Sequence, residues 1–145
     1  MKSQVQRLFH PNGVLRAEIP MQNGRPHGLK RHWHPNGVLA AEIPFENGLQ
    51  HGVTRAWATD GRLLGEYSME HGVGVHRDWY DNGILSQELD AYKGLPNGRQ
   101  KCWDENGEFP LETYYIMGKK VSRKKYLEAC KTDPKLPQYP EEKSA

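Results

Sequence analysis

Hydrophobic and polar residues alternate along most of this chain in short runs, and turns that contain Gly separate the runs. In the segment 29–52, one run leads to Pro35-Asn36-Gly37, and a second run leads away from it to Asn47-Gly48. Alternation with a period of two is typical of a β-strand with one buried face, and Asn-Gly between such strands indicates a tight turn. This segment therefore predicts a β-hairpin.

The hairpin pattern occurs five times, with an aromatic residue four positions before a Gly, an apolar residue two positions after it and a Glu five positions after it. The copies are 24 residues apart, except for a step of 22 between the third and the fourth. A period of this length predicts a repeat array. The aromatic and apolar positions, which we expect to form the repeated core, are Phe9, Trp33, Trp57, Trp79 and Trp103 together with Leu15, Leu39, Leu63, Leu85 and Phe109.

The expected fold is all-β, an elongated antiparallel meander of about five stacked hairpins with a short capping helix at the C-terminal end. The repeats are expected near 5–28, 29–52, 53–74, 75–98 and 99–121, so that residues 1–121 form one array. Ser122 is a suitable N-cap for a helix over 122–131 that covers the fifth hairpin. The tail 132–145 contains several Pro residues and ends in charged ones, so we expect it to be extended or disordered.

Two registers are compatible with the turns. A two-residue loop of Asn36-Gly37 would place Arg31 opposite Glu42 and would form a ladder of ion pairs in every unit. A three-residue loop, with Pro35 in a type I turn and Gly37 left-handed, uses both residues in the backbone conformations that they prefer. We favour the three-residue loop, because it also places Trp33 opposite Leu39 and gathers the apolar residues on one face.

In the favoured register Lys30, rather than Arg31, is the cross-strand neighbour of Glu42. The repeated Glu side chains then project from the polar face, where neighbours such as Lys30 for Glu42 and His76 for Glu88 could hydrogen-bond them with modest benefit, and they are the candidate protein-binding residues. These residues are Glu18, Glu42, Glu66, Glu88 and Glu112.

The repeated unit, aromatic-x-x-Asn/Asp-Gly-x-Leu-x-x-Glu followed by Asn-Gly-x-x-x-Gly, resembles the MORN-repeat variant of YwqK-type antitoxin proteins. Those proteins are regarded as the neutralising halves of bacterial toxin–antitoxin pairs. The resemblance extends from Phe9 to Gly118 and implies a protein-binding or membrane-adjacent scaffold. It supplies no catalytic residues, and the fold alone does not define a function.

Charge and composition narrow the possible partners. The formal net charge is only +2, so nucleic acid is not an expected partner, although a basic run over 119–125 could contact an anionic membrane surface. The chain shows no signal peptide and no apolar segment of membrane-spanning length, and Cys102 and Cys130 are isolated from other Cys residues. We therefore expect a cytoplasmic protein with free thiols.

No constellation of catalytic residues, metal ligands or cofactor-binding residues is visible. His10 and His34 hold equivalent positions in adjacent units, which places them about 10 Å apart, too far for one Zn²⁺. His27, His51 and His71 lie beside Gly residues and are read as turn residues. The sequence thus predicts a non-catalytic protein-interaction module, antitoxin-like or immunity-like, with another protein as its partner and with its N-terminal edge strand open to self-association. The alternative is a lipid-associated or structural scaffold.

Overall fold

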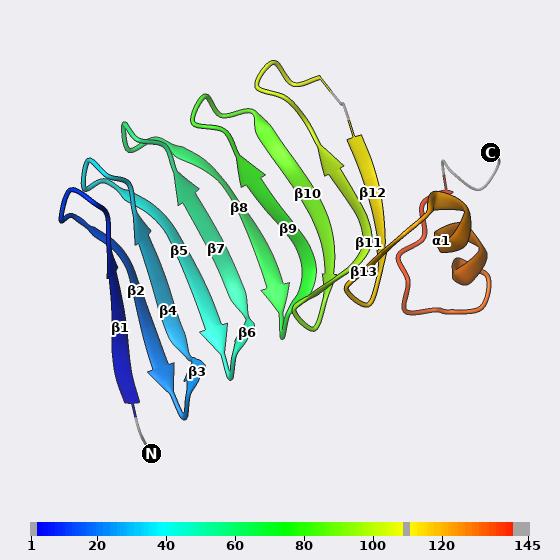
Figure 1. Cartoon of the computed structure of the whole chain (residues 1–145), viewed down its shortest axis with the longest axis horizontal. Helices are drawn as coiled ribbons and strands as arrows, with labels where there is room; N and C mark the ends of the chain where they lie inside the picture. Colours follow the sequence, from blue (N-terminus) through cyan, green and yellow to red (C-terminus); the bar gives the residue numbers. More distant parts are fainter. Residues whose placement is uncertain (1–2, 109–110, 141–145) are drawn as a thin grey trace.

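The structure is a computed structural model that describes residues 3–108 and 111–140. Within these residues, thirteen strands form a single antiparallel sheet and one helix follows it (Figure 1). The strands are β1 Ser3–Phe9, β2 Leu15–Gln22, β3 Arg25–Pro26, β4 Gly28–Trp33, β5 Leu39–Glu46, β6 Leu49–Gln50, β7 Gly52–Trp57, β8 Leu63–Glu70, β9 Val73–Trp79, β10 Leu85–Tyr92, β11 Leu95–Cys102, β12 Leu111–Ile116 and β13 Lys119–Val121, and the helix is α1 Arg123–Cys130. The two-residue strands β3 and β6 pair with β2 and β5, and the other strands follow one another in the sheet in sequence order, which confirms the predicted all-β meander of hairpins.

The turn at the tip of each hairpin is the three-residue loop that the sequence favoured. In the second unit the backbone N–H of His34 donates to the carbonyl of Val38 at 2.8 Å, and the N–H of Gly37 donates to the carbonyl of His34 at 2.9 Å. Gly37 has φ 88°, in the left-handed region that favours glycine. Trp33 is accordingly opposite Leu39.

The register changes one residue farther from the turn. Trp33 is opposite Leu39 but His32 is opposite Ala41, so Ala40 is an extra residue in a second bulge and Arg31 comes to face Glu42. Our prediction that one register holds along the hairpin, with Lys30 beside Glu42, is therefore wrong. The ion pairs that this register excluded are present: Arg7–Glu18 at 3.2 Å, Arg31–Glu42 at 3.1 Å, Arg55–Glu66 at 3.1 Å and Arg77–Glu88 at 2.8 Å. We call these four pairs the ion-pair ladder.

The turns that join one unit to the next are tight two-residue turns. Asn47 and Gly48 both have positive φ, at 50° and 88°, which is typical of a type I′ turn between twisted strands. The corresponding turns of the other units are centred on 23–24, 71–72, 93–94 and 117–118, and both residues of each also have positive φ.

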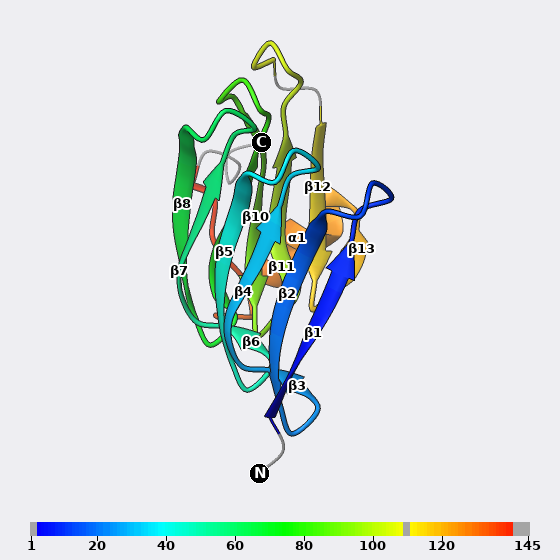
Figure 2. The same cartoon turned by 90° about the vertical axis from the view of Figure 1, so that its left-hand side faces the viewer.

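The sheet is curved, with its first and last strands bent toward the same side (Figures 1 and 2). The ion-pair ladder lies on the convex face. Thr54 and Tyr67 are opposite each other one position away from Arg55 and Glu66, so they lie on the concave face, and both are buried. The indole of Trp79 also reaches the concave side, where it lies directly against the backbone of Gly65.

The repeated aromatic and apolar residues are not uniformly enclosed. Phe9 and Leu63 are exposed, at 59% and 55%, whereas the Trp residues are half-buried. Phe109 lies outside the described residues. The most deeply buried cluster is at the C-terminal end, where Tyr114 of β12 packs with Tyr126 of α1 and with Leu136.

Helix α1 and the chain that follows it cover the convex face beside β12. The Oγ of Ser122 accepts a hydrogen bond from the N–H of Lys125 at 3.1 Å and caps the helix. Residues 132–140, expected as an extended or disordered tail, pack back on the sheet: Leu136 is only 2% exposed. The Tyr139 hydroxyl contacts Asp90 and accepts the backbone N–H of Arg99 at 2.7 Å.

Candidate binding face

The five units provide an internal comparison, because positions at which they agree are explained by the fold. At two concave-face positions the fourth unit carries a carboxylate and an amide that no other unit has there. Where that unit has Asp78, the other units have Leu8, His32, Ala56 and Cys102, and where it has Gln87, they have Ala17, Ala41, Gly65 and Leu111. The sheet therefore forms without a carboxylate or an amide at these positions, so these two side chains of the fourth unit are candidates for a function.

Asp78 and Gln87 belong to a row of hydrogen-bonded side chains that crosses the concave face. Gln87 Nε2 donates to Asp78 Oδ2 at 2.5 Å, and Gln100 Nε2 donates to Gln87 Oε1 at 2.7 Å. Tyr115 donates weakly to Gln100 Oε1 at 3.4 Å. On the other side of Asp78, His76 Nε2 lies 3.1 Å from Oδ2. We call these residues the concave polar row.

The row continues from His76 to Tyr67 and Gln50. The Tyr67 hydroxyl lies 2.8 Å from His76 Nδ1 and 2.9 Å from Gln50 Oε1. The row thus links side chains from β6, β8, β9, β10, β11 and β12.

The donors nearest to Asp78 point toward its carboxylate. The hydrogen bond from His76 and then that from Gln87 hold the pKa of Asp78 below its usual range, against the opposing effect of burial. The Asp78 side chain is still 49% exposed. Among the described residues its ion-pair partner is His76, and no Lys or Arg neutralises it as the Arg side chains of the ladder neutralise their Glu partners.

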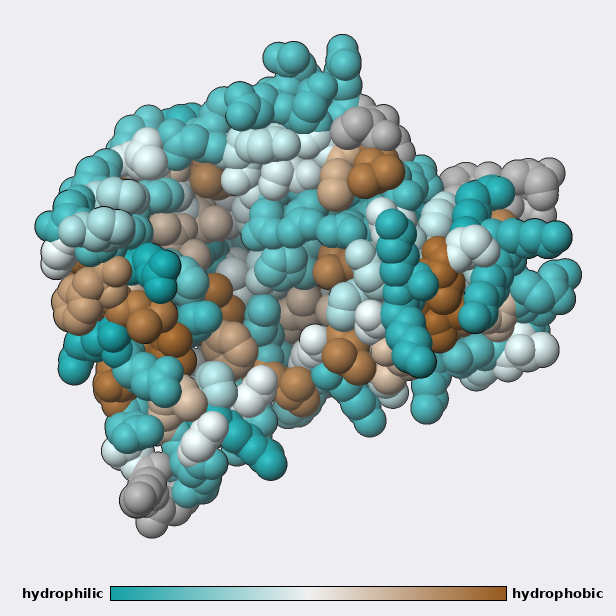
Figure 3. All heavy atoms as spheres, viewed as in Figure 1, coloured by the Kyte–Doolittle hydropathy of each residue, from teal (hydrophilic) through white to brown (hydrophobic). Residues whose placement is uncertain are grey.

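A cavity of about 330 Å³ lies beside the row on the same face. Its polar lining comes from Gln50, His76, Gln87 and Gln100, and its apolar lining includes Phe45, Leu49, Met69, Leu89 and Leu95. Figure 3 shows this face hollowed over the middle of the sheet, with both hydrophobic and hydrophilic side chains inside the hollow. Apolar walls with a few convergent polar groups are typical of binding pockets.

The order Tyr67, His76, Asp78 matches a nucleophile, a base and an orienting carboxylate. The electrostatics oppose that interpretation, because burial raises the pKa of Tyr67, whereas an activated nucleophile needs a lowered one. In addition, the hydroxyl is held between His76 and Gln50. The arrangement is better suited to fixing a surface than to attacking a substrate.

The N-terminal half of the concave face carries positive charge. Burial lowers the pKa of Lys30, and its ammonium group lies 5.9 Å from the ring centroid of Phe45, a residue of the cavity wall. Burial and the nearby Lys30 and Arg16 lower the pKa of His32, whose Nε2 is buried without a hydrogen-bond partner among the described residues. An ammonium group and the Asp78 carboxylate thus both adjoin residues that line the cavity.

The candidate Glu residues lie on the opposite, convex face. Four of them are the acidic members of the ion-pair ladder, and the fifth, Glu112, is opposite Lys101 and accepts a hydrogen bond from the Tyr114 hydroxyl at 2.7 Å. Their role in partner binding stays a prediction, since each of them already has a polar neighbour within the sheet.

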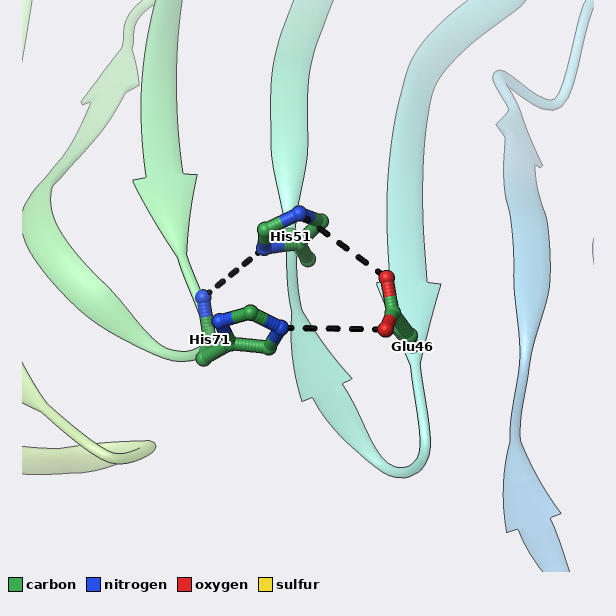
Figure 4. A group of neighbouring side chains, drawn as sticks. All are labelled: Glu46, His51 and His71. Atoms are coloured by element: carbon green, nitrogen blue, oxygen red, sulfur yellow. Dashed lines mark hydrogen bonds and ion pairs between the residues drawn. The ribbon is translucent and has the colours of Figure 1, made fainter.

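The structure brings two His residues and a carboxylate together at the turns that end the second and third units (Figure 4). The Nε2 atoms of His51 and His71 lie 3.8 Å and 3.7 Å from the oxygens of Glu46, and the two rings stack at 4.0 Å. The sequence did not place these residues together, because they hold non-equivalent positions in their units.

The local hydrogen bonds oppose metal binding by Glu46, His51 and His71. His51 Nδ1 accepts the backbone N–H of His71 at 3.0 Å, so the neutral ring carries its proton on Nε2, where a metal ion would have to bind. His27 Nδ1 accepts the N–H of Asn47 in the same way one unit earlier, at 3.1 Å. The shared role of His27 and His51 is therefore to join neighbouring units at their turns.

The remaining His residues discussed from the sequence also join units. His10 Nε2 and His34 Nε2 lie 2.7 Å and 2.9 Å from the carbonyls of Trp33 and Trp57, in the next unit along. Tyr80 makes the equivalent bond to Trp103 at 2.7 Å. Cys102 and Cys130 form no disulfide bond within the part of the chain that the structure describes.

A comparison with protein families matches residues 5–23 and 26–47, the first two hairpins, to the MORN repeat variant. Repeats of this kind are generally non-catalytic, and the similarity over these two hairpins indicates a repeat module for binding or scaffolding. No curated protein and no solved structure gave a match. Within the described part of the chain, no helix has the length and apolar character that crossing a membrane requires.

Proposed function

We propose that this chain is a non-catalytic protein-binding module that holds a partner protein on its concave face and neutralises it, as a cytoplasmic antitoxin or immunity protein does. The observation that carries the proposal is the concave polar row beside the cavity, because the fold does not require it. The neutralising role is suggested by the resemblance to antitoxin proteins, which neutralise the protein that they bind.

The concave face has physical properties that favour a protein partner. Its side chains are held by their neighbours, so little conformational entropy is lost when a partner orders them. The cavity offers a recess for an apolar anchor, and the row offers polar groups at its side. The convex face offers less, since its charges are paired and the C-terminal chain covers part of it.

Capture from a native lysate with matched variants tests the binding face. Gln100→Arg places a long cation in the cavity lining, whereas Val53→Arg makes a comparable change on the convex face, where Val53 is 38% exposed. We expect a stoichiometric protein partner to be captured by the wild type and by Val53→Arg but not by Gln100→Arg. Loss with Val53→Arg alone would place binding on the convex face and would contradict the proposal.

A growth assay tests neutralisation separately. The captured partner is expressed alone and then with wild-type protein or Gln100→Arg. We expect growth inhibition that the wild type relieves and Gln100→Arg does not. A partner that is harmless when expressed alone would remove the antitoxin-like part of the proposal and leave the binding part.

The alternative, a lipid-associated scaffold, is favoured by one observation. The basic residues Lys119, Lys120, Arg123, Lys124 and Lys125 are all exposed around β13 and the start of α1. Co-sedimentation with anionic vesicles at low salt that is lost at high salt, and that is lost when these residues are changed to Gln, would support it.

A further inference from the structure

The concave polar row identifies the chemistry that it would bind. Asp78 Oδ2 takes both hydrogen bonds of the carboxylate, from His76 and Gln87, while Oδ1 has no hydrogen-bond partner among the described residues. A half-exposed carboxylate that is fixed in direction and not paired with Lys or Arg complements a cationic group.

The neighbouring cavity adds a second requirement. His76 and Gln87 both line it and both hold Asp78, so the cavity opens beside the carboxylate. Its walls include Met69, Leu89 and Leu95, which suit an uncharged side chain. A partner that uses both features carries an apolar group next to a basic one.

The charges beside the cavity argue against a uniformly basic or a uniformly acidic partner. Lys30 lies over Phe45 of the cavity wall, and Asp78 is hydrogen-bonded to His76 and Gln87 of the cavity lining. A polybasic segment would be repelled by Lys30, and a phosphate-rich ligand would be repelled by Asp78.

We propose that the concave face recognises a segment of a partner protein in which an apolar side chain enters the cavity and an adjacent Lys or Arg side chain pairs with Asp78. This inference rests on the proposed function, because it assumes that the concave face is the binding face. The inference specifies which segment of the partner protein the concave face binds.

Displayed random peptides, selected on the immobilised full chain, test the inference without knowledge of the natural partner. We expect enrichment of sequences with an apolar residue next to Lys or Arg. The affinity of a selected peptide for Asp78→Asn should be about tenfold or more below that for the wild type, because a hydrogen bond to a charged group is worth about 1.5–3 kcal/mol. Glu128→Gln, the same kind of change at an exposed ion pair of α1, should leave the affinity unchanged.

Two further measurements on the wild-type protein test the proposed ion pair even if Asp78→Asn alters the sheet. Replacing the basic residue of the selected peptide by Gln should reproduce the loss on wild-type protein, and raising the salt concentration should weaken the unmodified peptide more than the Gln peptide. Binders without Lys or Arg, binders indifferent to Asp78→Asn and to the Gln replacement, or a selection with no binders would each overturn the inference. Peptides whose affinity falls with Gln100→Arg but not with Asp78→Asn would overturn the inference and leave the proposed function standing. Peptides whose affinity is unchanged by Gln100→Arg would contradict both the inference and the proposed function.

Discussion

The contact between Trp79 and Gly65 gives the sharpest test of how the units pack. Gly65 is the glycine of this sheet whose backbone is not left-handed, so it is required for space and not for its φ. A Cβ at this position would lie 2.3 Å from Cζ2 and 2.5 Å from Cε2 of Trp79. Carbon atoms in contact are about 3.5–4.0 Å apart, so in Gly65→Ala the indole ring must move by about 1 Å or more.

Overpacking of this kind costs about 1–3 kcal/mol, and the reduced freedom of the unfolded chain offsets about 0.4–1 kcal/mol of it. We therefore expect Gly65→Ala to lower the free energy of unfolding by about 1–2 kcal/mol, which corresponds to a fall in Tm of about 3–6 °C for a chain of this length. Thermal unfolding followed by circular dichroism or calorimetry measures the change.

A double-mutant cycle identifies the cause. Trp79→Phe replaces the indole by a smaller ring, so Gly65→Ala should cost much less in that background. Gly37→Ala is the matched control, because Gly37 has φ 88° and no atom within 4 Å of the added Cβ, so its cost is backbone strain that Trp79→Phe leaves unchanged. Equal costs of Gly65→Ala in both backgrounds, or a Gly65→Ala protein as stable as the wild type, would refute this account of the packing.

Further predictions concern buried and exposed polar groups. His32→Leu should leave Tm unchanged or raise it by an amount equivalent to about 1 kcal/mol, because it removes a buried unpaired nitrogen and installs the residue that Leu8 provides in the first unit; a clear fall in Tm would contradict this. Burial raises the pKa of Asp90, so its stabilising contribution is present at low pH and is lost as pH rises through its folded-state pKa. Asp78 has a lowered pKa, so its contribution is present above the unfolded pKa and is lost as pH falls through the folded one. Asp90→Asn and Asp78→Asn should therefore change the slope of Tm against pH in opposite senses, and slopes of the same sign would contradict the assignment. Glu66→Gln should lower the free energy of unfolding, measured in urea, by less than about 1 kcal/mol, because the ion pair of Glu66 with Arg55 is half exposed. A loss of several kcal/mol would show instead that the ion-pair ladder is a main source of stability.

The sequence predicted the hairpins, their order and the three-residue loops, because each depends on local residue preferences and on alternation. It failed at Arg31 and Glu42, since the reasoning assumed that one register must hold from the turn to the far end of the hairpin. The bulge at Ala40 allows both the Trp–Leu pair and the Arg–Glu pair to form. Arg and Glu 11 residues apart in four of the units were the available signal.

The candidate site was harder to predict for a different reason. Agreement between units led to the repeated Glu residues, whereas Asp78 and Gln87 of the concave polar row occur at their positions in the fourth unit alone. Asp78 and Gln87 could have been recognised as departures, but the hydrogen bonds that unite them with Gln100 depend on the curvature and register of the folded sheet. The contacts of Tyr139 with Asp90 and Arg99 on the convex face likewise join residues far apart in the sequence, and no local sequence pattern predicts them.

The shortened step between the third and fourth units shows which changes of length this architecture tolerates. Side chains alternate between the two faces with a period of two, so removing two residues at a turn keeps every later side chain on its original face. Removing one would send Asp78, Gln87 and Gln100 to the convex side and bring Arg77 and Glu88 into the hollow. Lengthening or shortening between the units should therefore occur in even numbers, and the steps of 24 and 22 residues obey that rule.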